Sequence, residues 1–267
     1  MTADDPVLWE ASDRIATITL NRPEARNALS SEMLDLLPRL MTQAEEDDGI
    51  DVMVLTGVDP AFCAGLDLKE LGSTAGNVAT GRSAAGGGAD GAASVHSARG
   101  PFPPHTKPLI GAVNGVAVTG GFELALNCDF LVASERAKFG DTHARVGIMP
   151  GWGLAVLLPQ AIGVRRAREM SFTGNFMDAG EALEFGLVNR VVPHDQLLQT
   201  ARAIAADIVG NDQAALRQLR ATYDAVTFHD DGWEAEARSA RAWRRDHFSA
   251  EQVAERRAAI QERGREQ

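Results

Sequence analysis

The sequence has little cysteine, a deficit of positive charge and no long apolar run. Its two cysteines, Cys63 and Cys128, form neither a CxxC pair nor a disulfide framework, so we expect a reducing compartment. The formal net charge of −11 argues against binding to nucleic acid or to an anionic membrane, because both need a surplus of Lys and Arg. No apolar run is long enough to span a bilayer, and residues 1–6 lack the apolar segment of a signal peptide. We therefore expect a soluble, cytoplasmic protein.

Apolar residues make up 45% of the chain, which is enough for one large domain with a sizeable core. Short apolar and β-branched runs predict strands at residues 14–20, 51–56, 108–113, 129–133, 137–139 and 187–192. Helical spacing and capping residues predict helices at residues 31–47, 122–127 and 195–209, and throughout the chain after Asp212. Strands that alternate with helices in this way indicate a layered α/β fold.

Local signals mark the ends and interruptions of these helices. Pro38 is expected to kink the first helix or to divide it in two. Asp178 and Glu181 have the spacing of a capping box, and Gly186 is expected to end the helix that begins there.

Two regions differ from the alternating pattern. Residues 72–104 are rich in Gly, Ala and Ser, which predicts a flexible surface loop, although a loop of this length is also often a lid over a binding site. The helical residues after Asp212 carry Trp233 and Trp243 and end in a strongly charged stretch at residues 251–267, which we expect to be a solvated helix. We therefore divide the chain into a core at residues 1–205 and a C-terminal helical region at residues 206–267.

Two glycine-bearing turns each connect an apolar strand to a helix. Gly65 and Leu66 follow the predicted strand at residues 51–56, and Gly120 and Gly121 follow a second apolar run. A helix N-terminus leaves backbone N–H groups without partners and carries positive potential. Because the carboxyl ends of neighbouring parallel strands lie side by side, two such turns can form an oxyanion hole. Glycines at these positions can equally reflect close packing between helix and strand.

Three segments resemble the signatures of the enoyl-CoA hydratase/isomerase (crotonase) superfamily in order, spacing and local character. They are FCAGLDLKEL at residues 62–71, KPLIGAVNGVAVTGGFELALNCDF at residues 107–130 and FGDTHARVGIMPGWG at residues 139–153. LNRPEARNALS at residues 20–30 and EALEFGLVNRVV at residues 181–192 are also similar to that family, so the resemblance spans about residues 10–195. It implies a crotonase-like fold of repeated ββα units that form a spiral core, followed by a C-terminal helical region. It also implies homotrimers, which often pair into hexamers.

The resemblance also implies roles for individual residues. Leu66 and Gly120 correspond to the family positions whose N–H groups bind the thioester oxygen, and Glu123 corresponds to a catalytic carboxylate of the hydratases. The segment Leu66, Asp67, Leu68 and Lys69 corresponds to the stretch that lies along coenzyme A. Arg26 lies in a segment that approaches coenzyme A, where it is either a phosphate contact or a surface residue without a role. Coenzyme A would be part of the substrate, so no separate cofactor is expected.

The sequence departs from the hydratase pattern at position 143, where the family has a second glutamate. His143 can act as an acid or base near neutral pH, so Glu123 and His143 could divide the two proton transfers. The alternative is a buried imidazole that is held by Asp141 or that lines the substrate pocket. Trp152 either shapes the acyl pocket or packs in the core.

Other catalytic patterns do not occur. The chain has no HExxH motif, no Cys/His cluster and no GxSxG turn, so we expect neither a metal nor a serine nucleophile. The leading hypothesis is an enoyl-CoA hydratase that adds water to a 2-trans-enoyl-CoA. The alternatives are an isomerase that uses Glu123 as its single base, and an acyl-CoA-binding protein without turnover.

Overall fold

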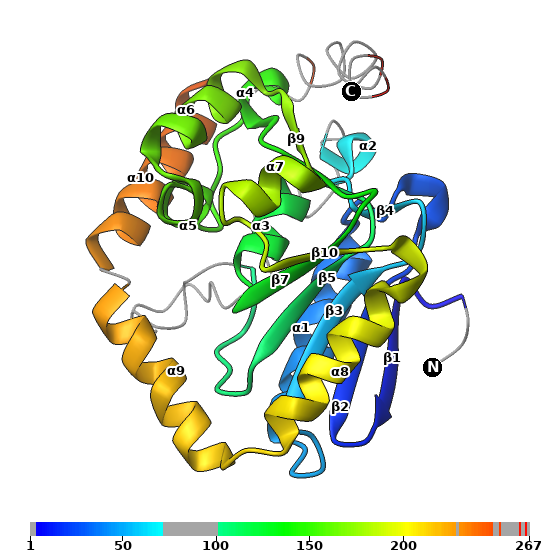
Figure 1. The fold of residues 1–267 in the computed structure, drawn as a ribbon. Coiled ribbons are helices and arrows are strands. Elements are labelled where there is room, and N and C mark those ends of the chain that lie inside the picture. The colour runs from blue at the N-terminus through cyan, green and yellow to red at the C-terminus, as the bar shows by residue number, and fades with distance from the viewer. Residues whose placement is uncertain are drawn as a thin grey trace.

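The computed structural model describes residues 4–71, 101–227 and 230–247, together with residues 251, 262 and 265. Its larger sheet contains β1 (Val7–Ser12), β2 (Ile15–Leu20), β3 (Val52–Gly57), β5 (Leu109–Val113), β7 (Phe130–Ser134) and β10 (Arg190–Val192), which are neighbours in that order (Figure 1). Its smaller sheet contains β4 (Ala61–Cys63), β6 (Val116–Val118), β8 (Lys138–Gly140) and β9 (Phe176–Asp178). Neighbouring strands are parallel except for β1 with β2 and β8 with β9.

Three consecutive ββα units carry the chain from one sheet to the other. In each unit the first strand joins the larger sheet, the second joins the smaller sheet, and a helix follows. The units are β3, β4 and α2 (Leu68–Leu71); β5, β6 and α3 (Gly120–Leu126); and β7, β8 and α4 (His143–Val146). This arrangement confirms the predicted α/β fold of repeated ββα units.

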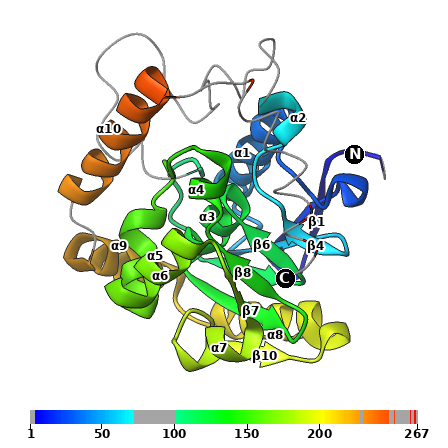
Figure 2. The ribbon, with the colours of Figure 1, turned by 90° about the horizontal axis from the view of Figure 1, so that it is seen from above.

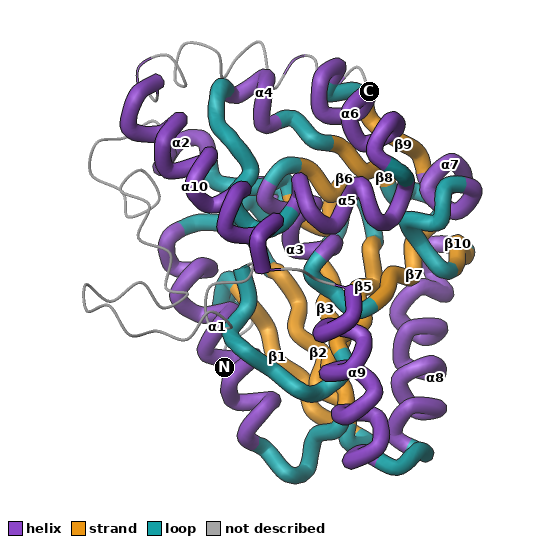
Figure 3. Tube along the Cα trace, turned by 90° about the vertical axis from the view of Figure 1, so that its left-hand side faces the viewer, coloured by secondary structure: helices purple, strands orange, loops and turns teal. Residues whose placement is uncertain are grey.

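Both faces of the larger sheet are buried, as the apolar runs in its strands require. Val52 and Val54 of β3 point toward α8 (Leu197–Val209) and pack in one cluster with Leu197, while Met53 and Leu55 point to the opposite face and pack in the main core. Figure 3 shows the strands between α8 on one side and α1 (Ser31–Glu46) on the other.

Helix α1 is continuous through Pro38, so of the two predicted effects of this proline, a kink or a division into two helices, the division does not occur. Ser30 caps its start by accepting a hydrogen bond from the Met33 N–H at 3.3 Å, as predicted. A proline in a helix interior costs about 3 kcal/mol. The buried stripe that offsets this cost comprises Met33, Leu37, Leu40, Met41 and Ala44.

The structure also adds and shortens elements. The strands β1, β4 and β9 were not predicted; β4 lies between the predicted strand at residues 51–56 and the first glycine turn. The predicted strand at residues 187–192 is paired only at Arg190–Val192, while Leu187 and Val188 are buried without forming strand. The capping box of Asp178 and Glu181 is confirmed at the start of α7 (Ala179–Glu184).

Helices form most of the chain after the third ββα unit. Helices α5 (Leu154–Ile162) and α6 (Val164–Thr173) pack against each other, and α10 (Asp230–His247) lies beside α5 (Figure 2). The division at residue 205 stays a prediction, and α8 runs across it. Most of the predicted helix at residues 251–267 and most of the predicted loop at residues 72–104 lie outside the described residues. Among the described residues, no helix combines the length and the apolar character that a membrane crossing requires.

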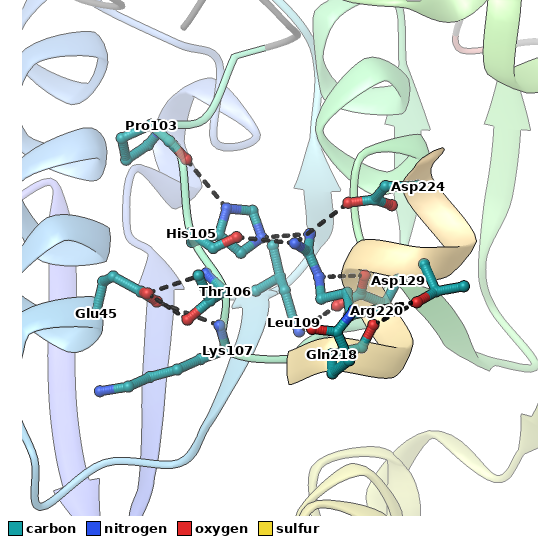
Figure 4. Close-up of polar contacts among 11 residues, drawn as sticks. Glu45, Pro103, His105, Thr106, Lys107, Leu109, Asp129, Gln218, Arg220 and Asp224 are labelled. Atoms are coloured by element: carbon teal, nitrogen blue, oxygen red, sulfur yellow. Dashed lines mark hydrogen bonds and ion pairs between the residues drawn. The ribbon is translucent and has the colours of Figure 1, made fainter. Parts of the chain in front are cut away.

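Arg220 ties helix α9 (Gln213–Thr227) to the core. Arg220 donates to the Asp129 carboxylate at 2.9 Å, to the His105 carbonyl at 2.8 Å and to the His105 ring at 3.0 Å (Figure 4). No residue of α9 is buried, so polar contacts rather than a packed apolar face hold this helix.

Candidate active site

The candidate site lies where three neighbouring strands of the smaller sheet end. Strands β4, β6 and β8 are parallel, so their carboxyl ends lie side by side. The residues that directly follow them are 64–67, 119–121 and 141–143, and these contain Leu66, Gly120 and His143. The topology therefore brings together the three segments that the sequence singled out.

The backbone donors of the predicted oxyanion hole are adjacent. A Cβ placed on Gly120 would lie 3.7 Å from the Leu66 nitrogen. The residues on either side of Leu66 bind Leu29 through the Gly65 carbonyl, at 2.7 Å, and the Asp67 N–H, at 3.0 Å. No backbone acceptor among the described residues takes the Leu66 N–H, and Gly120 is the first residue of α3, where N–H groups have no partner within the helix. Two neighbouring N–H groups are thus available to one acceptor.

Close approach of the two turns explains their glycines. Gly65 has a φ of +83°, and a Cβ there would lie 2.1 Å from the Thr119 hydroxyl; a Cβ on Gly121 would lie 2.1 Å from the Cys63 carbonyl. Thr119 itself has a φ of 48°, which is uncommon for a residue with a side chain. Strain of this kind persists only where the surrounding structure fixes the backbone, and here it precedes the donor Gly120.

A buried acid–base cluster lies beside these turns. Glu123 of α3 and His143 of α4 are 2% and 4% exposed, and Glu123 Oε2 lies 3.4 Å from His143 Nε2. On its other side, His143 Nδ1 lies 2.7 Å from Asp141 Oδ1, which also accepts the His143 N–H at 3.1 Å. The imidazole is therefore held between two carboxylates, and its contact with Asp141 is the one that the structural alternative for His143 included.

This arrangement changes the acid–base character of His143. Burial lowers the pKa of His143. The charge of Glu123 and the hydrogen bond to Asp141 raise this pKa by more than burial lowers it, so that it reaches about 10. The pKa of Asp141 is lowered, because hydrogen bonding and the charge of His143 outweigh the effect of burial. The side chain is consequently an imidazolium at neutral pH, able to donate a proton but unable to accept one.

The carboxylate of Glu123 is oriented by the loop after α4. Its Oε1 accepts the Gly151 N–H at 3.2 Å and the Trp152 N–H at 2.7 Å. The Trp152 ring lies 3.1 Å from where a Cβ on Gly120 would be, so this ring borders the turn that contains Gly120. The ring also packs against the core. Oε2 is left to face His143.

The residues expected to contact coenzyme A lie at the rim of the site. The Asp67 carboxylate is buried and binds the Arg22 guanidinium at 3.1 and 3.2 Å, so it fixes the turn rather than pointing outward. Lys69 is exposed and Leu68 is partly exposed. Arg26 is exposed, and its carbonyl accepts the Ala64 N–H at 3.0 Å, which places its backbone directly beside the first turn.

Two residues near the site were not found from the sequence. Arg22 ties Asp67 to the Ala28 carbonyl, at 2.6 Å, and Glu236 of α10 binds the loop that orients Glu123. Arg22 lies within a segment that resembles the family, but Glu236 is one of many charged residues in a charged helix. Nothing in its local sequence distinguishes it.

The ββα repeats and the paired glycine turns define a protein of the crotonase fold class. The sequence profile of the enoyl-CoA hydratase/isomerase family matches residues 10–265. The chain therefore belongs to that family.

Individual relatives are similar over most of their length. A probable peroxisomal enoyl-CoA hydratase of Arabidopsis thaliana is 40% identical over 210 residues, which cover 78% of this chain and 74% of that protein. A probable enoyl-CoA hydratase of Mycobacterium bovis is 38% identical over 217 residues, which cover 81% of this chain and 80% of that protein. The crystal structure of an enoyl-CoA hydratase from Mycobacterium smegmatis is 50% identical, has a TM-score of 0.77, and covers 90% of this chain and 98% of its own.

Proposed function

We propose that this protein is an enoyl-CoA hydratase that reversibly adds water to a 2-trans-enoyl-CoA. One observation carries the proposal: a buried Glu123–His143 pair adjoins two neighbouring N–H groups, those of Leu66 and Gly120. The N–H groups stabilise negative charge on a thioester oxygen, and the pair moves protons at the two adjacent carbons. The substrate class follows from the family and from its named hydratases.

The protonation states divide the chemistry between the two side chains. The thioester oxygen accepts hydrogen bonds from Leu66 and Gly120, which makes the β-carbon electrophilic. Glu123 takes one proton from water as the water oxygen bonds to the β-carbon, and the electron pair of the double bond moves to the enolate. The enolate collapses as its α-carbon takes a proton from the His143 imidazolium.

The contact between the two side chains also restores the site. After one turnover Glu123 holds the proton from water and His143 is neutral. Their facing atoms lie 3.4 Å apart, so the proton passes from Glu123 to His143 without leaving the site. Asp141 stays ionised and holds the imidazole in place throughout. In this scheme His143 takes the place of the second glutamate of the family hydratases.

The alternative activity is double-bond isomerisation with Glu123 as the single base. The observation that favours it is the lack of a second free carboxylate among the described residues at the site, because Asp141 is bound to His143. An isomerase moves a proton between two carbons of the substrate and needs no activated water. Crotonyl-CoA distinguishes the two activities by product, because hydration yields a 3-hydroxyacyl-CoA, whereas isomerisation moves the double bond without adding water.

The test follows the absorbance of the conjugated thioester of crotonyl-CoA with substoichiometric protein, alongside Glu123→Gln. We expect steady loss of absorbance, formation of a 3-hydroxyacyl-CoA, and a rate lower by about 10²–10⁴ in the variant. Constant absorbance with bound substrate would exclude hydration. A 3-enoyl-CoA would then test the isomerase, and failure of both reactions would leave an acyl-CoA-binding protein.

We also propose that the chain assembles as a homotrimer, or as a hexamer of two trimers, in the cytoplasm. The large apolar side chains Leu219, Tyr223 and Val226 lie on one face of α9 and are 54–67% exposed. Burial of such a face by another subunit removes apolar surface from water. The location is supported by Cys63 and Cys128, which are free thiols.

A further inference from the structure

One face of α10 packs against residues 147–155, the loop that orients Glu123. Trp233, Glu236, Ala240 and Trp243 recur at helical spacing, and each meets the chain between residues 147 and 155. The Trp233 ring covers Gly153, whose φ of +97° and lack of a side chain allow the approach. Trp243 donates its indole N–H to the Gly147 carbonyl at 3.0 Å. Figure 2 shows α10 alongside α5, whose first turn follows this loop.

The loop is bound by two carboxylates, one from α3 and one from α10. Glu123 accepts the N–H groups of residues 151 and 152, at 3.2 and 2.7 Å. Glu236 accepts those of residues 153 and 155, at 2.5 and 2.6 Å, with one carboxylate oxygen for each. Asn127 completes the arrangement by donating to the Trp152 carbonyl at 2.7 Å. Four N–H groups within five residues therefore depend on these two side chains.

The position of Glu236 is electrostatically costly. Its side chain is buried, and burial together with the charge of Glu123 raises the pKa of Glu236, while the Gly153 and Ala155 N–H groups lower it only in part. An exposed helix residue could cap α5 at a lower cost. The buried geometry instead places a second carboxylate on the loop that binds Glu123.

We propose that Glu236 is a positioning residue for catalysis, which fixes the Gly151–Ala155 backbone so that the Glu123 carboxylate keeps its orientation toward His143. The inference rests on the proposed hydratase function. It assigns a role to the C-terminal helix, since α10 then sets the geometry of a carboxylate on α3.

The role predicts which property changes when Glu236 is altered. Leu66, Gly120 and the predicted coenzyme A contacts lie on other segments, so binding of the thioester does not depend on this loop. The Glu123 carboxylate, and the Trp152 ring beside Gly120, do depend on it. A small misplacement of a reacting group can lower a rate by as much as about 10²-fold. The change therefore falls on kcat rather than on binding.

The experiment compares Glu236→Gln and Glu236→Ala with Glu234→Gln as the matched control. Glu234 lies on the same helix, is exposed and pairs only with Arg238 among the described residues, at 3.0 Å. Three quantities are measured: kcat on crotonyl-CoA, affinity for the unreactive butyryl-CoA by calorimetry, and amide hydrogen exchange across residues 147–155. Glu236→Gln preserves side-chain volume, so these three quantities can be measured in it even if Glu236→Ala is too unstable to study.

We expect kcat to fall roughly 10–100-fold in Glu236→Gln, and further in Glu236→Ala, with butyryl-CoA affinity within about 2-fold of wild type. The Gly151 and Trp152 amides, which Glu236 does not touch, should exchange faster. An unchanged kcat, or unchanged protection of those two amides, would overturn the proposal and leave Glu236 as a helix cap. If the wild type itself does not hydrate crotonyl-CoA, the hydratase assignment fails, whereas the amide exchange still tests the positioning of Glu123.

Discussion

At the scale of single residues, the protonation of His143 links activity to stability. The ordinary pKa of 6.5 is raised to about 10 in the folded chain, where burial is outweighed by Glu123 and Asp141. Below pH 6.5 the imidazole is charged in both the folded and the unfolded chain, so its two ion pairs stabilise the fold fully. As the pH rises above 6.5 the unfolded chain loses this proton first. The stabilisation therefore declines until the folded imidazole has titrated near pH 10.

We predict that His143→Gln removes this dependence on pH and lowers hydration by about 10²–10⁴-fold. In the wild type, the urea midpoint should fall between pH 7 and the folded pKa of about 10, and kcat should fall toward the same upper limit. In the variant the midpoint should change less over this range. If the urea midpoint changes equally with pH in the two proteins, the ion pairs of His143 do not stabilise the fold. If the variant hydrates at the wild-type rate, His143 is not the proton donor.

The sequence identified most of the residues that meet at the site, but not how they are held. Gly65, Gly120 and Glu123 lie within local segments, and the resemblance of these segments to the family assigned their roles. His143 was found because a histidine replaces an expected glutamate. Glu236 lies more than 80 positions from the loop it binds, as its bond to Gly153 shows, and one sequence contains no signal for such a contact.

At the scale of elements, α1 is held at its C-terminus by a buried lysine. Lys107 is 1% exposed, and its ammonium donates to the Ala44 carbonyl at 2.7 Å and the Asp47 carbonyl at 2.8 Å. Glu45 of the same turn accepts the Thr106 and Lys107 N–H groups at 3.0 and 3.2 Å (Figure 4). A cation at the end of a helix satisfies carbonyls that have no partner within the helix. These contacts join α1 to the segment that enters β5.

We predict that Lys107→Met destabilises the fold by about 1–3 kcal/mol, because it leaves the buried Ala44 carbonyl without this donor, while the Asp47 carbonyl still accepts the Ile50 N–H. Methionine keeps the apolar length of the side chain, so the fall in the free energy of unfolding measures the contribution of the ammonium group. Urea unfolding measures it, with Lys69→Met as the control because Lys69 is exposed. A loss below about 0.5 kcal/mol would show that water replaces the ammonium at this helix end.

The elements themselves were predictable where apolar periodicity is strong. The strands β3, β5 and β7 follow short apolar runs, and β2 follows the alternating run at residues 14–20; most residues of all four strands are buried. The three-residue strand β4 is too short to show a period. The continuity of α1 through Pro38 depends on the tertiary burial of Leu37 and Leu40, which the local rule for proline does not include.

At the scale of the whole molecule, α9 presents an apolar face that the described chain leaves exposed. Leu219, Tyr223 and Val226 lie at positions i, i+4 and i+7 and are 54%, 67% and 67% exposed. Arg220, on the adjoining face, holds the helix to Asp129, so the helix is fixed while its apolar residues remain outside. An exposed apolar helix face is suited to an interface between subunits.

We predict that Tyr223→Glu dissociates the proposed trimer, because a charge at the centre of an apolar interface is left without a partner. Sedimentation velocity should show wild-type mass at a multiple of three chains of 28.5 kDa, and a smaller species for the variant. Ala225→Glu is the control, since Ala225 is exposed and points away from Tyr223 on the helix. A monomeric wild type would refute the assembly itself. A trimer that survives Tyr223→Glu would instead place the interface elsewhere, and α9 would then be free to serve another partner.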